Sequence, residues 1–488
     1  MNATLAEETT RCRLAQQDWS RLPLAQRLRC LRRFRHLLVE QAEALSLVIT
    51  QDIGRSKDEV LATDILPSAD ACWYLERQSA DLLRPRHVPR RHTPAWLLNM
   101  RQTVERRPHG LVGIIGTWNY PVFLNAIQIL QALAAGNGVL WKPSELTPAF
   151  AVHLATLFSQ AGFPKDLFIP LPAEREWGER LINATIDFLV FTGSAEVGRK
   201  IAARLGERLI PSVLELSGCD AAIVCDDADL HLAARALWYG VTLNQGQTCL
   251  AVRRIFASRQ IMPELIRLLR HYAPDRRAAP LALYSQAVQA ERVIQQAIQA
   301  GAELLFPDPF LRAEDDPPRF PPTVVVQATT DMAITQEAAF APIAALLAYE
   351  NQSDLEAQLE KCSFALAASI FTQKKSRAFA IAARLRCGLV TINDVIAGIA
   401  HPATPFGGHQ SSGWGVTQGA EGLLSMTVPR VISENRVRYR PHFDLHRQPE
   451  LVALLRGLLA WNHAGSLRAR IKGFLQILGS LWRSIKPW

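Results

Sequence analysis

The stretch IDFLVFTGSAEVGRKIAARL, residues 186–205, combines a strand, a turn and a helix, and it decides the fold class. Its first residues form a short apolar run of the kind found in buried parallel strands. Gly193 permits a tight turn, and the residues after Ser194 read as a helix. A strand that leads directly into a helix is the repeating unit of a doubly wound α/β sheet.

The same unit recurs on both sides of this stretch. Upstream, GLVGIIG at 110–116 precedes a helical stretch at 122–135, and GNGVLWK at 136–142 precedes a helix at 147–161. Downstream, strands and helices alternate again from residue 252 to about 406. We therefore expect two doubly wound α/β domains, with ligands beyond the carboxyl ends of their strands. The downstream segments are helices near 262–272 and 285–300, strands near 323–327 and 388–393, and a Pro- and Asp-rich surface loop at 307–322.

The two ends of the chain have different patterns. Residues 5–83 read as helices, and the apolar positions of the segment 24–38 recur at helical spacing while arginines occupy its other face. A break rich in proline and arginine follows at 85–94, and residues 96–107 are predicted to be an extended arm. The last residues, from 441 onward, form a basic tail that is analysed below.

Composition and charge exclude several classes of protein. The chain has 488 residues, of which 49% are hydrophobic and 20% charged, as in a folded soluble protein of two or three domains. The net charge is +9, but the arginine-rich helix face lacks the interleaved aromatic residues or glycines typical of nucleic-acid binding, so no nucleic-acid partner is expected.

Cysteine usage and hydropathy indicate the compartment. None of the eight cysteines has C-x-x-C spacing, so neither a metal site nor a disulfide framework is expected, and reduced thiols in a cytoplasm are predicted. The N-terminus lacks the apolar region of a secretory signal. No window of about 20 residues is free of charge, so no membrane-spanning helix is predicted.

One cysteine stands in a setting suited to chemistry. Cys249 lies in the stretch NQGQTCL, residues 244–250, after a predicted helix at 231–244. Glycine and amides favour a turn whose N–H groups point at a ligand. A thiol at such a turn can attack an electrophile while backbone amides receive the oxyanion. The alternative is that Cys249 is a small buried hydrophobic residue.

Four motifs in a fixed order decide between these alternatives. They are GIIGTWNYP at 113–121, WKPSE at 141–145, FTGSAEVG at 191–198 with LELSG at 214–218, and NQGQTC at 244–249. This order and spacing resemble the aldehyde dehydrogenase superfamily over roughly residues 20–435. The short distance from the start to the cysteine is most similar to the branch of the class 3 and fatty-aldehyde enzymes.

The resemblance implies a catalytic role for three residues. Cys249 would attack the aldehyde carbon, and the Asn119 amide with the backbone N–H of Cys249 would hold the oxyanion. Glu215 matches the family's general base, which activates the water that hydrolyses the thioester. Read without the family, Asn119 could only shape a turn and Glu215 could form a structural ion pair.

The resemblance also implies a dinucleotide site, with NAD as cofactor and NADP as the alternative. Glu145 disfavours a 2′-phosphate by charge repulsion and so favours NAD. The helix N-terminus after Ser194 would meet the pyrophosphate. The residues implied around the cofactor are Ile115, Trp118, Lys142, Glu145, Gly193, Ser194, Gly198 and Phe340.

The sequence departs from the family at several positions. Around Phe340 the chain reads EAAFAP, so Ala338 replaces the second of two glutamates, the one that binds the nicotinamide ribose. Thr117 stands for a proline, and Ser217 and Ala341 stand for glycines. The cysteine, glutamate and asparagine of the catalytic set are all present.

The predicted organisation combines the sequence pattern with the resemblance. The fold class is an aldehyde dehydrogenase-like α/β fold with two doubly wound domains, a β-arm for oligomerisation and a C-terminal amphipathic helical tail. In chain order we expect cofactor-domain helices at 1–94, an oligomerisation arm at 95–109, the dinucleotide-binding domain at 110–220, the catalytic domain at 221–421, an oligomerisation strand at 422–440 and a basic amphipathic tail at 441–488.

The predicted function is oxidation of an aldehyde, of medium or long aliphatic chain, to a carboxylate with NAD(P)+. The resemblance implies a homodimer or homotetramer. One alternative is an acylating enzyme that passes the thioester to coenzyme A, against which Glu215 argues. The other is a membrane-associated relative without turnover, which only Ala338 supports.

The tail predicts a helix with one apolar stripe. Its apolar residues follow the spacing i, i+4, i+7, i+8, i+11, i+14, i+15, i+18, and no acidic residue occurs after Glu450. A basic amphipathic helix suits the interface of an anionic membrane, so peripheral binding is expected. The alternative is that the stripe packs on the enzyme or a sister subunit. The stripe consists of Leu467, Ile471, Phe474, Leu475, Leu478, Leu481, Trp482 and Ile485.

Overall fold

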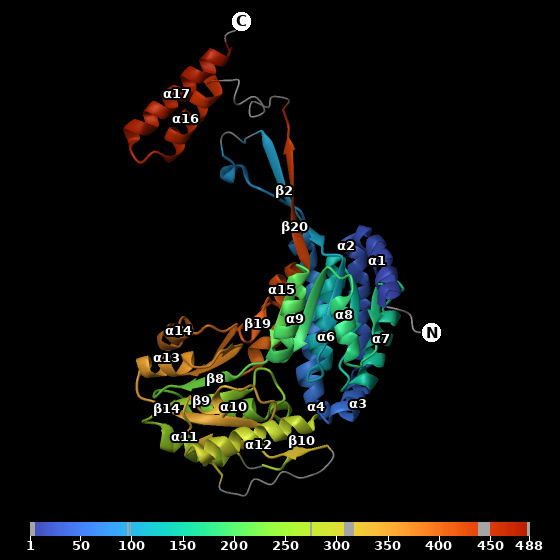
Figure 1. Cartoon of the computed structure of the whole chain (residues 1–488), viewed down its shortest axis with the longest axis vertical. Coiled ribbons are helices and arrows are strands. Elements are labelled where there is room, and N and C mark those ends of the chain that lie inside the picture. The colour runs from blue at the N-terminus through green and yellow to red at the C-terminus, as the bar shows by residue number, and fades with distance from the viewer. Residues whose placement is uncertain are drawn as a thin grey trace. The chain divides into compact units, whose positions relative to one another are not determined.

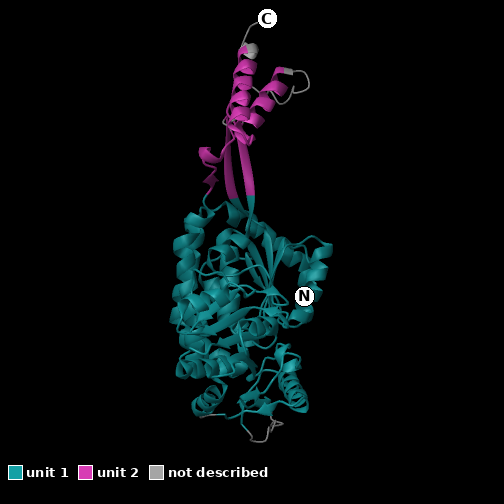
Figure 2. Ribbon diagram, turned by 90° about the vertical axis from the view of Figure 1, so that its left-hand side faces the viewer, with its two compact units in different colours: residues 1–84, 106–429 teal, residues 85–105, 430–488 magenta. Residues whose placement is uncertain are grey.

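A computed structural model describes the chain in two compact units (Figure 2). The first unit comprises residues 1–84 and 106–429, and the second comprises residues 85–105 and 430–488. The described residues are 5–94, 97, 99–273, 276–306, 317–437 and 449–485.

The first unit contains a six-stranded sheet that is parallel except at one edge. The stretch 186–205 forms a central strand, a turn and the helix α9 (Ala195–Glu207), as predicted. In spatial order the strands are β19 (Gly413–Trp414), β7 (Ser212–Leu216), β6 (Phe188–Gly193), β3 (Leu111–Ile115), β4 (Gly138–Lys142) and β5 (Phe168–Pro170).

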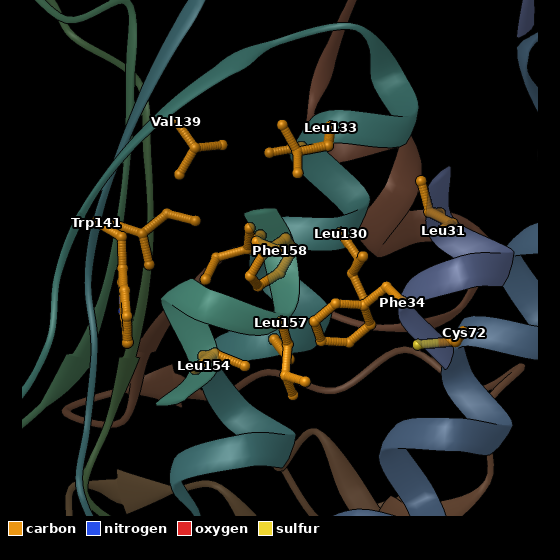
Figure 3. Packing of buried hydrophobic residues seen from close by; sticks show 14 of the residues in the cluster. Leu31, Phe34, Cys72, Leu130, Leu133, Val139, Trp141, Leu154, Leu157 and Phe158 are labelled. Carbon is orange, nitrogen blue, oxygen red and sulfur yellow. The ribbon is translucent and has the colours of Figure 1, made fainter. Parts of the chain in front are cut away.

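Both faces of this sheet are buried because helices pack on each of them, and successive side chains of a strand point to opposite faces. In β3, Val112 and Ile114 pack into one core with the helices α2, α5, α6 and α7, which Figure 3 shows from close by. Leu111 and Ile115 pack into the other core with α8 and α9. The bounds are α2 (Leu24–Glu40), α5 (Leu66–Leu83), α6 (Pro121–Ala135), α7 (Pro148–Gln160) and α8 (Glu176–Asn183).

A seven-stranded sheet forms the other half of the first unit, with its helices on both faces (Figure 1). Only its edge pair is antiparallel. The strand order is β11 (Glu303–Leu304), β13 (Thr323–Val326), β14 (Ile343–Tyr349), β9 (Val252–Ser258), β8 (Asp220–Val224), β16 (Ala367–Phe371) and β17 (Leu389–Ile392). Its helices are α10 (Leu230–Thr242), α11 (Met262–Tyr272), α12 (Tyr284–Gln299), α13 (Gln352–Glu360) and α14 (Lys375–Ala382).

The chain passes from one sheet to the other within three residues. β7 belongs to the six-stranded sheet and β8 to the seven-stranded sheet, although only residues 217–219 separate them. The chain returns at β19, which pairs antiparallel with β7 and lies inside the range expected for the catalytic domain. Glu215 therefore lies where the two sheets meet.

The remaining elements of the first unit largely follow the expected pattern, with one correction. Part of the predicted loop 307–322 is a strand, because Phe320 is buried and β12 (Arg319–Phe320) pairs with β10 (Ala279–Pro280). Residues 307–316 of that loop lie outside the described residues. The other elements are α1 (Leu5–Arg21), α3 (Ala42–Ile53), α4 (Lys57–Val60), α15 (Gly419–Ser425) and the strand pair β15 (Phe364–Ala365) and β18 (His409–Gln410).

Most of a three-stranded sheet and a pair of helices form the second unit. The sheet has the order β1 (Arg86–His87), β2 (Met100–Pro108) and β20 (Thr427–Asn435), so the predicted arm is a strand. The helices are α16 (Pro449–His463) and α17 (Leu467–Ile485). The sequence analysis predicted α17 but not α16. The parts of the predicted tail at 441–448 and 486–488 lie outside the described residues.

Candidate functional site

The cysteine turn begins where helix α10 is forced to end. Asn244 and Gln245 both have φ of 51°, and Gly246 has φ of 70°, so the helix ends at Thr242 rather than at the predicted residue 244. Left-handed backbone is uncommon outside glycine, and such positions cluster at functional sites. A Cβ at Gly246 would lie 2.4 Å from the Ala341 carbonyl group. The turn therefore requires glycine there.

Asn119 and Tyr120 fasten this turn to the first sheet. The Asn119 side-chain amide donates to the Gln247 carbonyl oxygen at 3.0 Å, and Asn244 donates to the Asn119 carbonyl oxygen at 3.1 Å. The hydroxyl groups of Tyr120 and Thr248 are 2.7 Å apart. An asparagine amide has two N–H groups, so one remains after the bond to Gln247. The structure thus places the Asn119 side chain beside the cysteine turn.

A buried arginine holds the backbone of Asn119 by a hydrogen bond. Arg55 is fully buried and donates to the Asn119 carbonyl oxygen at 3.1 Å and to Asp64 at 3.0 Å. Its guanidinium lies 4.5 Å from the centre of the Tyr120 ring. Burial raises the pKa of Asp64 to about 6, although the charge of Arg55 acts in the opposite direction. This buried ion pair fixes the backbone that carries Asn119.

Glu215 and Cys249 are in direct contact. Each is almost fully buried, and the Cys249 thiol lies close enough to the Glu215 carboxylate for each group to shift the pKa of the other. Burial raises the pKa of Glu215 to about 7, although hydrogen bonds from Cys249 and Thr192 act in the opposite direction. Burial, followed by the charge of Glu215, raises the pKa of Cys249 well above its usual value. The carboxylate is thus placed to accept the thiol proton.

The second oxygen of Glu215 carries no protein hydrogen bond. Among the described residues, its Oε2 atom is buried without a partner, and Glu215 forms no ion pair. The structural ion pair considered from the sequence is therefore absent from the described part of the chain. A buried carboxylate with a pKa near neutrality and an open oxygen suits a general base.

Arg253 ties the cysteine turn to the segment that contains Phe340. This buried arginine donates to the carbonyl oxygens of Gly246 and Ala341. Phe340 packs in the same apolar cluster as Cys249, and its ring centre lies 6.2 Å from that of Trp118. Ala338 is half-buried two residues before Phe340. The EAAFAP segment therefore lies next to the site, as the resemblance implies.

A cavity of about 730 Å³ lies beyond the carboxyl ends of β3, β4 and β6. A volume of this size suits a large ligand. Of the residues that the sequence analysis assigned to the cofactor, Ile115, Trp118, Lys142, Glu145 and Gly193 line this cavity.

Three assigned residues lie outside the lining of this cavity. The Ser194 hydroxyl accepts from the backbone N–H of Val197 at 3.3 Å and so caps α9. A Cβ at Gly198 would lie 2.5 Å from the Leu216 side chain, so Gly198 allows α9 to approach β7 closely. Phe340 lies in the Cys249 cluster instead.

Charged residues that the sequence analysis missed border the same cavity. Arg175 donates to Glu145 at 2.6 Å, and Lys142 donates to the other oxygen of Glu145 at 3.2 Å. Burial acts to raise the pKa of Glu145, but the hydrogen bonds from Arg175 and Lys142 hold it below its usual value. Lys200 and Arg204 of α9 also line the cavity. Arg175 follows β5, and the rule that ligands bind at carboxyl strand ends could have found it.

These features suit a dinucleotide in this cavity. The N-terminus of α9 presents backbone N–H groups at a sheet edge, a setting that binds phosphate. Lys142, Lys200 and Arg204 add positive charge at the cavity. When bound there, a nicotinamide cofactor would accept a hydride. The fold and the site therefore define a thiol-dependent oxidoreductase that uses a dinucleotide.

Comparison with known proteins identifies the family. The family model of the aldehyde dehydrogenases, described as "Aldehyde dehydrogenase family", matches residues 3–432. The chain belongs to the aldehyde dehydrogenase family and is an NAD(P)-dependent aldehyde dehydrogenase.

Two curated relatives illustrate the range of named activities. The chain is 30% identical over 444 residues to a 4,4′-diapolycopene aldehyde oxidase of Methylomonas, covering 89% of this chain and 82% of that protein. It is 30% identical over 446 residues to a Mycolicibacterium smegmatis protein named as an NADP+ succinate-semialdehyde dehydrogenase, covering 89% and 85%. Neither is named as a class 3 or fatty-aldehyde enzyme, so the expected branch stays a prediction.

Solved structures agree with the family assignment. The NAD+ complex of an aldehyde dehydrogenase from Bacillus cereus has a TM-score of 0.82 and 27% identity over 88% of both chains. An aldehyde dehydrogenase structure from Burkholderia cenocepacia has a TM-score of 0.83 and 27% identity, covering 89% of this chain and 90% of that chain.

Proposed function

We propose that this enzyme oxidises a medium- or long-chain aliphatic aldehyde to the carboxylate, with NAD+ as cofactor and NADP+ as the alternative. The contact between the Cys249 thiol and the Glu215 carboxylate carries the proposal of catalysis, because it joins a nucleophile to a base. The apolar surroundings of Cys249 support an aliphatic substrate.

The chain's own residues suffice for the thiol and water steps. Glu215 accepts the proton of Cys249 as the sulfur attacks the aldehyde carbon and forms a thiohemiacetal. The Asn119 amide and the backbone N–H of Cys249 hold the oxyanion. Glu215 then passes the thiol proton to solvent and is a carboxylate again. A nicotinamide held in the cavity would accept the hydride of the thiohemiacetal and leave a thioester. Glu215 removes a proton from water, which attacks the thioester and releases the acid and the Cys249 thiolate, which regains a proton.

The substrate proposal rests on the residues around the cysteine. Cys249 packs in a cluster with Leu250, Leu366 and Phe406, against which Phe340, Ile396 and Ile399 also pack. Ile399 also contacts a second apolar cluster, which contains Tyr120 and Phe123. The Methylomonas relative is named for a large hydrocarbon aldehyde, which is consistent with such surroundings. Succinate semialdehyde, named for other relatives, carries a carboxylate that such apolar surroundings would disfavour.

An aldehyde panel tests this proposal. With straight-chain aldehydes and NAD+ or NADP+, we expect kcat/KM to rise roughly three- to fourfold for each methylene group that becomes buried, since each contributes about 0.8 kcal/mol. Added coenzyme A should not increase the rate. A higher kcat/KM for succinate semialdehyde than for every aliphatic aldehyde would overturn the substrate assignment, and formation of acyl-CoA would favour the acylating alternative.

Because alanine stands at position 338 where the family has a glutamate, we expect weak binding of the nicotinamide ribose. Ala338→Glu should restore a charge-assisted hydrogen bond worth about 1.5–3 kcal/mol and so lower the KM for NAD+ by up to roughly a hundredfold or speed the hydride step. The measurement is steady-state and single-turnover kinetics with varied NAD+. Gln336→Glu is the matched control, because it adds the same charge at a nearby exposed position. Equal kinetics in all three proteins would show that another residue holds the ribose.

We also propose assembly as a homodimer or homotetramer in the cytoplasm. β20 is an edge strand of its sheet, and Val428, Val431 and Ile432 on it are exposed. An exposed edge with apolar side chains is a template for pairing with another chain. The dehydrogenase function, by contrast, depends only on residues of the first unit.

A further inference from the structure

The two C-terminal helices, α16 and α17, pack against each other through small residues. We call this pair the C-terminal hairpin. A Cβ at Gly473 would lie 2.6 Å from the backbone of Trp461, and one at Gly457 would lie 2.9 Å from the Gly473 carbonyl oxygen. Gly457, Gly473 and Ser480 are buried. Close packing through glycine means that the large apolar side chains of α17 are not needed to join the helices.

Those large side chains are exposed instead. Leu467 is 74% exposed, Leu475 is 60% exposed and Trp482 is 64% exposed. The partner helix adds Leu459, which is 63% exposed. The stripe predicted from the sequence is thus present and largely exposed. α16 covers only part of it, where the ring centre of Phe474 lies 4.8 Å from that of Trp461. The exposed apolar side chains of the hairpin are Val452, Leu459, Trp461, Leu467, Ile471, Phe474, Leu475, Leu478, Leu481 and Trp482.

The charge of the hairpin has one sign. After Glu450 the sequence contains six lysines and arginines and no aspartate or glutamate. Arg468, Arg470 and Lys472 are exposed at the start of α17, where the apolar stripe also begins. Within the part of the chain that the structure describes, no helix is long and apolar enough to cross a membrane.

We propose that the C-terminal hairpin docks onto the surface of an anionic phospholipid bilayer, with its apolar side chains in the acyl boundary and its basic side chains among the headgroups. Large exposed apolar patches mark interaction surfaces, and a basic helix with Trp and Phe suits the lipid interface. A second copy of the chain is a poorer partner, because a symmetric contact would bring two basic hairpins together. Nucleic acid would neutralise the charge but leave the aliphatic side chains in water.

The inference goes beyond the proposed oxidation and does not depend on it. Binding to lipid is a property of the second unit, whereas Cys249, Glu215 and Asn119 all lie in the first unit. A hairpin that binds membrane would hold the enzyme where lipophilic aldehydes partition. Failure of binding would therefore leave the catalytic assignment untouched, and failure of catalysis would leave the binding result untouched.

Flotation of the full-length protein with vesicles tests the proposal. The vesicles contain phosphatidylcholine alone or with about one-third phosphatidylglycerol, at low and high salt, because salt screens surface charge. We expect the wild type to float with the anionic vesicles at several times the fraction seen with neutral ones, and less at high salt. Leu475→Glu with Leu478→Glu should abolish flotation, and Arg468→Gln with Arg470→Gln and Lys472→Gln should remove the preference for anionic vesicles.

A control variant in the first unit shows whether flotation depends on the hairpin or only on the total exposed apolar surface of the protein. Leu14→Glu with Val152→Glu replaces two exposed apolar residues of the first unit and should float like the wild type. Oxidation of a short, water-soluble aldehyde confirms that each variant is folded. Wild-type protein that stays unbound to every vesicle would overturn the proposal. A different result would assign the apolar face to a second copy of the chain. In that case the wild type would not float, and sedimentation would give a smaller assembly mass for Leu475→Glu with Leu478→Glu than for the wild type.

Discussion

Replacing Cys249 by serine should lower kcat for aldehyde oxidation by roughly 10⁴-fold or more, as expected when a covalent nucleophile is lost. A hydroxyl group is a much weaker acid than a thiol. The site already raises the pKa of the Cys249 thiol, and it would disfavour a buried alkoxide still more. Glu215, with a pKa of about 7, could not remove the proton of a serine hydroxyl. The nucleophile would therefore be lost while the hydrogen-bonding group remains.

The measurement is NADH formation with a saturating aldehyde, together with thermal unfolding. Serine is no larger than cysteine and can donate to the same carboxylate, so the unfolding temperature should change little. Cys30→Ser is the matched control. Its half-buried thiol donates to the Gly162 carbonyl oxygen at 3.3 Å, far from the site in sequence, and a hydroxyl can make the same bond. Full activity in Cys249→Ser would contradict a mechanism in which the Cys249 thiol is the nucleophile.

Replacing Glu215 by glutamine should lower the steady-state rate by about 10²–10⁴-fold, the range for loss of a general base. Glutamine cannot take the thiol proton, but it also removes the negative charge that raises the pKa of Cys249, so the thiol can lose its proton to water instead. The acyl-enzyme should therefore form and then hydrolyse slowly. One equivalent of NADH should appear in a burst before the slow phase, since acylation precedes the blocked step. Rapid-mixing absorbance records both phases. Glu264→Gln is the control, because Glu264 is an exposed residue of α11 paired with Arg267 and does not line the cofactor cavity.

The pH dependence provides a second test of Glu215. Burial raises its pKa to about 7, so the carboxyl group is protonated, and inactive as a base, at pH values below that point. The deacylation rate of the wild type should therefore rise with pH through about 7. The glutamine variant should lack this rise. An unchanged profile in the variant would mean that another group activates the water.

The alternation of strands and helices could be predicted from the sequence because it depends on neighbouring residues. The apolar run at 186–192 followed by Gly193 produces a strand and a turn wherever it lies in the fold. The same holds for the helix of residues 262–272, which the structure reproduces. The order of four motifs then indicated the family, and with it Cys249, Glu215 and Asn119.

The sequence pattern did not predict which groups meet across the fold. Arg253 and Arg175 are single charged residues in otherwise ordinary segments, and only the sheet arrangement brings them to Gly246 and to Glu145. The end of α10 at Thr242 likewise depends on left-handed backbone at Asn244 and Gln245, which contacts across the fold hold in place. Local preference favoured two more helical residues.

The sequence by itself thus determined the periodic features: two α/β patterns, the cysteine turn after a helix, and an apolar stripe in a basic tail. Only the tertiary structure decided that residues 217–219 carry the chain from one sheet to the other, so that Glu215 contacts Cys249. It also decided that Gly457 and Gly473 join the C-terminal helices, which leaves the stripe exposed. The physical reason is that periodicity is set by short-range geometry, whereas burial and pairing depend on which surfaces the whole chain brings into contact.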